Sequence, residues 1–168
     1  QVDARASAGS IGVTSGGDLR VEATATGDIA LASTGGSVIV GRVGQLDGVP
    51  GGIGAEAVNG AGAVSVTAAQ GIAVADSLSA GGALSMNAGG LVSLDGSATG
   101  QTIALTAADL AIGSAGSLGN AGTQRISLAS SAPVNLGAGA SSGFAVDAAE
   151  VARIQSGGDR LVTALAGA

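Results

Sequence analysis

The chain contains neither cysteine nor histidine, and these two absences exclude several kinds of protein. Without cysteine no disulfide can stabilise the fold, and the sequence carries no sign of the redox state of its compartment. Without either residue, serine–histidine and cysteine–histidine catalysis cannot be built, and the usual zinc sites are excluded. Any acid–base chemistry would therefore depend on carboxylates.

Positive charge is also scarce, because lysine is absent and all six basic residues are arginine. Twelve acidic residues oppose them and give a net charge of −6. Nucleic acids and anionic membranes bind clustered positive charge. No apolar run approaches the roughly 18 residues of a spanning helix, and a GxxxxGK phosphate loop needs lysine. We expect no nucleic-acid partner, no membrane insertion, no cofactor and no metal.

Aromatic residues are nearly missing, since Phe144 is the only one, yet apolar residues make up 46% of the chain. The core must therefore be built from Val, Ile, Leu and Ala, which suits a narrow stack of aliphatic side chains. Glycine occupies 32 positions without a Gly-X-Y register, and proline occurs only twice, so collagen is excluded. The apolar residues alternate regularly and the mean hydropathy is +0.53, which disfavours disorder.

A glycine-led unit recurs along the chain and reads Gly, any residue, apolar, any residue, apolar. Every second unit returns after about 19 residues: Val64 to Leu84 is 20, and Leu84 to Ile103 is 19. Two short strands in such a period predict one coil of a β-solenoid. We therefore predict an all-β, right-handed parallel β-helix that forms a single domain over residues 1–168. The clearest copies are GSIGV, GDLRV, GDIAL, GSVIV, GAVSV, GALSM and GLVSL.

Alternation with a period of two places the apolar residues of each unit inside the solenoid. Paired glycines, such as those at 81–82 and 89–90, are expected at the corners with positive φ. The predicted core comprises Leu19, Val21, Ile29, Leu31, Val38, Val40, Val64, Val66, Leu84, Met86, Val92, Leu94, Ile103, Leu105, Ile126 and Leu128.

Three segments depart from the repeat. Residues 41–61 predict a long loop insertion, which either folds back over the outward Ile39 or forms an exposed contact surface. Within residues 111–124 we expect a second, shorter loop of about four or five extra residues. Residues 147–155 predict a short helix, from Ala148 to Ile154, that lies against a coil or across an open end. Asp147 and Glu150 form its capping box, and glycines 157–158 end it.

Charged residues are expected to serve the structure. Asp18, Asp28, Asp76, Asp95 and Asp109 stand singly at strand starts and turns, where an aspartate caps its own backbone two residues on. Arg153 and Arg160 are expected to form surface ion pairs with the acidic residues around them. The calcium-binding GGxGxDx repeat is not matched by GGDLRV or GGDRLV. Threonines do not recur every 19 residues, as an ice-binding solenoid would require.

The units GGDLRVEA, GDIALAS and GALSMNAGGLVSLDGS, with the tail VDAAEVARIQSGGDRLV, resemble the β-helical exoproteins of the filamentous haemagglutinin type. The resemblance implies secretion across an outer membrane by a dedicated partner and a role in adhesion or surface scaffolding. The Asn-Pro signature of that family's secretion domain does not occur here. Because residue 1 is not Met, we expect a processed product or an interior shaft segment.

Three functions remain open at this point. The first is a non-catalytic shaft or adhesive segment of a secreted bacterial surface exoprotein, whose partners are neighbouring segments and surface glycans or proteins. The second is a self-assembling extracellular filament subunit that stacks head to tail through open solenoid ends. A polysaccharide-active enzyme comes third, because it needs a carboxylate cluster that these spacings do not assemble.

Overall fold

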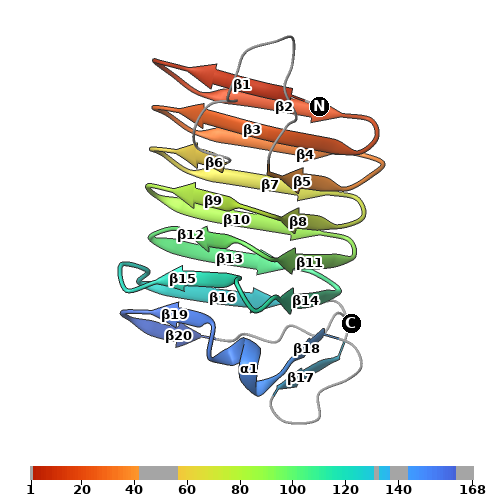
Figure 1. The fold of residues 1–168 in the computed structure, drawn as a ribbon, viewed down its shortest axis with the longest axis vertical. Coiled ribbons are helices and arrows are strands. Elements are labelled where there is room, and N and C mark those ends of the chain that lie inside the picture. The colour runs from red at the N-terminus through yellow and green to blue at the C-terminus, as the bar shows by residue number, and fades with distance from the viewer. Residues whose placement is uncertain (1, 42–56, 131–132, 137–143, 162–168) are drawn as a thin grey trace.

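A computed structural model describes residues 2–41, 57–130, 133–136 and 144–161 of the chain. The polypeptide winds into coils that stack along one axis, with β1 and β2 at one end and β19 and β20 near the other (Figure 1). Strands of successive coils pair in parallel and in register. The fold is therefore the parallel β-solenoid that the repeat predicts, with about five complete turns.

One face of the solenoid is a seven-stranded sheet that takes one strand from each coil. Its register aligns Val64, Leu84 and Ile103 on three successive coils, so the predicted period is confirmed. In order, its strands are β2 (Ile11–Ser15), β4 (Ile29–Ser33), β7 (Val64–Ala68), β10 (Ala83–Ala88), β13 (Thr102–Thr106), β16 (Arg125–Ala129) and β20 (Asp159–Leu161).

The other face is an eleven-stranded sheet that consists of two rows. In β3 (Leu19–Ala25) one continuous strand spans both rows, because its first half pairs with β5 and its second half with β6. Later coils bend between the rows and so contain three strands, not two. The first row continues through β5 (Val38–Val40), β8 (Ile72–Val74), β11 (Leu91–Leu94) and β14 (Asp109–Ile112). The second row continues through β6 (Ala57–Gly60), β9 (Ser77–Ala80), β12 (Ser97–Thr99), β15 (Ser117–Asn120) and β19 (Ile154–Ser156), while β1 (Val2–Ala6) pairs with β3.

All sixteen predicted core residues are buried, with at most 2% of each exposed. The second row adds core residues that the five-residue unit does not contain. Val58, Leu78, Ala98 and Leu118 are each 0% exposed and follow one another at intervals of 20 residues. This 20-residue spacing could have predicted the second row, but the strands around these residues are short and consist mostly of small or polar residues.

The predicted insertion 41–61 is too long at its C-terminal side. Residues 57–60 form β6, which pairs with β3 and β9 and contributes the buried Val58 to the core. Residues 42–56 lie outside the described part of the chain. In this coil Val40 is the last residue of the first-row strand β5, and the next described strand, β6, belongs to the second row. The insertion therefore falls between the two rows in the sequence.

The shorter loop predicted within residues 111–124 is confirmed, although most of that segment forms the end of β14 and β15. The extra residues form only the turn from Asn120 to Thr123, which leads into β16. The fully buried Thr123 hydroxyl donates to Gly100 O at 2.8 Å and accepts from Asn120 N at 3.1 Å. A polar side chain thus closes this corner from within.

The true excursion from the coil follows β16. It contains β17 (Val134–Leu136) and β18 (Phe144–Val146), which pair with each other, and the helix α1 (Ala148–Val151). The predicted capping box of Asp147 and Glu150 is present. The helix is shorter than the predicted 147–155, because Ile154 opens β19 and packs into the core. Glycines 157–158 therefore follow a strand and do not end the helix.

The corner glycines are required for a different reason from the one predicted. Among the described glycines, positive φ occurs only at Gly9, Gly41 and Gly119, and not at the paired glycines. At Gly81 and Gly89, an added Cβ would overlap the carbonyl oxygens of Ala61 and Ala69 on the preceding coil. Coils stack only about 4.8 Å apart, so a side chain that points along the axis has no room.

We predict that Gly89→Ala lowers the free energy of unfolding by about 1–3 kcal/mol, because the methyl group forces two coils apart. Gly17→Ala is the matched control: this corner glycine has open space around its Cβ position and no positive φ. It should change stability by less than about 1 kcal/mol. Urea unfolding followed by circular dichroism measures both, and equal effects would contradict the close-approach explanation.

Candidate functional site

Asp18 and Asp28 lie at corners of the solenoid, as predicted, but their carboxylates bond to the next coil and not to their own backbone. Asp18 Oδ1 accepts a hydrogen bond from Ser37 N at 2.8 Å, and Asp28 Oδ1 accepts one from Ala63 N at 2.8 Å. Each carboxylate therefore joins two coils at a corner, where the strand ladder is interrupted.

These bonds belong to short ladders that run along the axis. On one corner Ser10 Oγ accepts from Asp28 N at 3.0 Å, one coil before Asp28 itself accepts from Ala63. On the other corner Ser37, which donates to Asp18, accepts from Gly71 N through its hydroxyl at 3.3 Å. The first coils are thus tied together by a chain of side-chain to backbone hydrogen bonds.

The remaining carboxylates do not assemble into a cluster. Asp109 Oδ1 accepts from Leu110 N at 2.9 Å and from Ala145 N at 3.0 Å, while Asp76 and Asp95 lie on successive coils. Within the described ranges, no group of three or more acidic residues lies close enough to hold a metal ion. Asp18, Asp28 and Asp109 therefore serve as hydrogen-bond acceptors for backbone amides.

The most specific polar arrangement lies at the free edge of β14, the last strand of the first row. Ile112 N donates to Glu150 Oε1 at 2.9 Å, and Arg153 Nη1 donates to Ile112 O at 3.1 Å. The other oxygen of Glu150 accepts from Asp147 N at 2.9 Å, which completes the capping box. One carboxylate thus fixes the start of α1 and seals a strand edge that lies 38 residues earlier.

This arrangement corrects the prediction of surface ion pairs, because Arg153 binds a main-chain carbonyl and not a carboxylate. The side chains of Asp159 and Arg160 lie outside the described part. In a parallel ladder, alternate residues bond to the same neighbour, so Leu110 and Ile112 present their N–H groups away from β11. Asp109 and Glu150 accept from these two groups. The edge where another strand could pair is therefore occupied by side chains.

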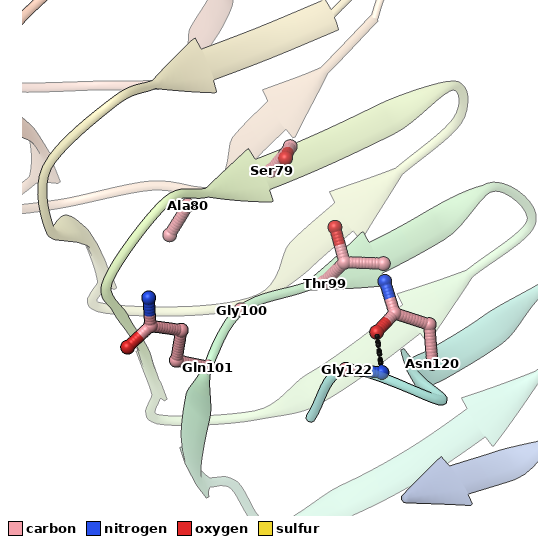
Figure 2. Close-up of a pocket in the computed structure, with 7 residues that line it drawn as sticks. All are labelled: Ser79, Ala80, Thr99, Gly100, Gln101, Asn120 and Gly122. Atoms are coloured by element: carbon pink, nitrogen blue, oxygen red, sulfur yellow. Dashed lines mark hydrogen bonds between the residues drawn. The ribbon is translucent and has the colours of Figure 1, made fainter. Parts of the chain in front are cut away.

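A shallow depression of about 190 Å³ opens at the corner between the second row and the seven-stranded sheet (Figure 2). Ser79 and Thr99 are register partners, and Asn120 follows on the next coil, where its Oδ1 accepts from Gly122 N at 2.8 Å. The depression offers polar contacts without a charged side chain or an aromatic ring. Its lining residues are Ser79, Ala80, Thr99, Gly100, Gln101, Asn120 and Gly122.

Threonines align better than the linear spacing suggests, because the insertion offsets their numbers. Thr14, Thr67 and Thr106 occupy one register position of the seven-stranded sheet and are exposed. Ala32 and Asn87 interrupt this row on the coils between them. The row is therefore a discontinuous hydroxyl array on a face of small side chains.

Comparisons with protein-family models, with curated proteins and with solved structures find no match to this chain. Within the described residues, no helix is long and apolar enough to cross a membrane.

We predict that Glu150→Ala lowers the free energy of unfolding by about 1–3 kcal/mol, because it leaves the partly buried edge amide of Ile112 without its acceptor. Glu150→Gln should lose less, since its amide oxygen can still accept one of the two bonds. Val151→Ala is the control on the same helix, at a side chain that is 39% exposed. Amide hydrogen exchange at Ile112 should be faster in Glu150→Gln than in the parent, and fastest in Glu150→Ala. Unchanged protection of this amide in both variants would contradict the role of Glu150 at the strand edge.

Proposed function

We propose that the chain is a non-catalytic shaft segment of a secreted bacterial surface exoprotein of the filamentous haemagglutinin type. The observation that carries the proposal is the continuous aliphatic core, which extends through every coil from Leu19 to Leu128. Each coil is held by its neighbours through parallel pairing. Such a stack is a rod of fixed width whose length grows by about 4.8 Å per coil, which suits a spacer.

The use of the carboxylates supports a structural role. Asp18, Asp28, Asp109 and Glu150 all accept hydrogen bonds from main-chain amides, and each of them joins two coils or seals the edge of β14. A polysaccharide-active site would need such groups to converge on a substrate. Their observed partners are instead backbone groups, which favours a shaft over an enzyme.

The insertion is our candidate contact segment on this shaft. Its flanks, Val40 and Val58, pair with Val74 and Leu78 of the next coil, where only residues 75–77 join the two rows. In the preceding coil the continuous strand β3 joins the rows directly. The coil therefore needs no insertion to close, and we infer that the extra residues serve adhesion.

A filament subunit is the second candidate, and one observation favours it. Ile11 and Val13 at the β2 end are only half-buried, although their partners Ile29 and Leu31 are buried. At the opposite end, β17 and β18 lie below β14, and α1 lies between them and β19 and β20 (Figure 1). Identical copies would have to accommodate that excursion to stack head to tail, so we favour the shaft.

To test the contact segment, residues 41–57 are replaced by a copy of residues 75–77, which preserves the register of both rows. We predict a melting temperature within about 3 °C of the parent, because no core side chain is removed. Binding of the fluorescently labelled protein to cultured epithelial cells should fall at least about tenfold.

The control for this experiment carries Ser65→Ala and Ser85→Ala on the seven-stranded face and keeps the insertion. It should bind as the parent does. Equal binding by the replacement variant would remove the insertion as the contact segment, and no binding by the parent itself would remove adhesion from the proposed function.

A further inference from the structure

The corner that joins the second row to the seven-stranded sheet changes along the axis. In the first coils its side chains hold the main chain: Ser10 Oγ accepts from Asp28 N at 3.0 Å, and Asp28 Oδ1 accepts from Ala63 N at 2.8 Å. Further along, the main chain bridges two coils by itself, since Gln101 N donates to Gly82 O at 2.8 Å. The fold therefore does not need the polar side chains of the later coils to close this corner.

Four of these later side chains line the depression at the same corner (Figure 2). Those of Ser79, Thr99 and Gln101 make no hydrogen bond with the part of the chain that the structure describes. The fourth, Asn120, accepts from Gly122 N through Oδ1 at 2.8 Å, so its amide nitrogen is left as a donor, on the side of Thr99 in Figure 2. A few donors and acceptors placed in one hollow fix the orientation of a ligand.

The polar groups continue along the axis from this depression. Asn59, Ser79 and Thr99 are register partners on three successive coils and alternate with the buried residues of the second row. Because coils stack about 4.8 Å apart, they offer one hydrogen-bonding side chain at each step. Gln101 and Asn120 join them at the depression. These five residues, the corner column, suit an elongated ligand whose polar groups also repeat.

Two classes of ligand do not suit the corner column. Phosphate and sulfate groups bind cationic side chains, whereas the depression has none and the chain carries a net charge of −6. An extended peptide bound through its main chain needs a free strand edge, but β9, β12 and β15 each pair on both sides. Sugar hydroxyls both donate and accept hydrogen bonds, and neutral hydroxyl and amide side chains supply partners for both.

We infer that the corner column binds a neutral, unbranched oligosaccharide that lies along the solenoid axis. Its hydroxyls bond to Asn59, Ser79 and Thr99 in turn, and one sugar unit occupies the depression beside Gln101 and Asn120. This binding site goes beyond the proposed shaft function, and it depends neither on secretion nor on the insertion.

Titration of the ¹⁵N-labelled full chain with cellotetraose, maltotetraose and chitotetraose, followed by two-dimensional NMR, tests this inference. At least one of the three should shift the backbone amides of Gln101 and Gly122 and the side-chain amides of Gln101 and Asn120, with a Kd of about 1 mM or tighter. A sulfated heparin tetrasaccharide should shift none of them, because the chain is acidic.

Two variants each remove one hydrogen-bonding group and leave the main chain unchanged. Gln101→Ala and Thr99→Val should each raise the Kd about two- to tenfold, which is the effect of one neutral hydrogen bond. Thr106→Val is the matched control, since Thr106 is exposed on the seven-stranded face and does not line the depression. It should bind as the parent does.

Three results would overturn the inference. They are the absence of shifts with every neutral tetraose at about 5 mM, equal binding by all three variants, and binding of the sulfated tetrasaccharide as tight as that of the neutral ones. These measurements use purified protein and no cells. Their failure is therefore distinguishable from failure of the insertion to mediate adhesion.

Discussion

The spacing between stacked parallel strands, about 4.8 Å, is the constraint on which the rest of this structure depends. It admits alternating side chains inside and outside each strand but leaves no room for a Cβ that points along the axis. Gly81 and Gly89 meet this limit at the corners. It also brings each corner amide within reach of the previous coil, where Asp18 and Asp28 accept hydrogen bonds. Within the described coils, each strand of the seven-stranded sheet therefore pairs with the strand of the next coil in the same register.

The repeat predicted most of the fold because its signal is periodic and local. Alternation around Leu84 and Met86, or Val64 and Val66, identifies inward positions without knowledge of the partner strand. The five-residue unit does not predict the second row, because strands such as β12 bury a single alanine, Ala98, between small polar residues. The prediction of positive φ at the corner glycines is wrong for a related reason. The close approach of the preceding coil is a tertiary property, which the conformational preference of glycine does not reveal.

The polar sites were predictable only in part. The capping box of Asp147 and Glu150 is local, and the sequence predicted it correctly. Its second task is not local, since the amide of Ile112 comes into contact with Glu150 only when the excursion after β16 returns to the first row. The same holds for Arg153, which suggested an ion pair but binds a carbonyl. A carboxylate that stands alone in the sequence can therefore be structurally engaged through a backbone group far along the chain.

The central claim is that successive coils, and not successive strands, are neighbours in register. Because the chain has no cysteine, two cysteines can be introduced at a chosen pair of positions and labelled with nitroxide spin labels at those positions alone. Labels at Ser65 and Ser85, which are register partners on adjacent coils, should show strong spin–spin broadening at a separation of about 5 Å. Labels at Ser65 and Ala73, on opposite faces of one coil, should show little. The reverse result would indicate a meander of sequential hairpins and would contradict the solenoid and the functions derived from it.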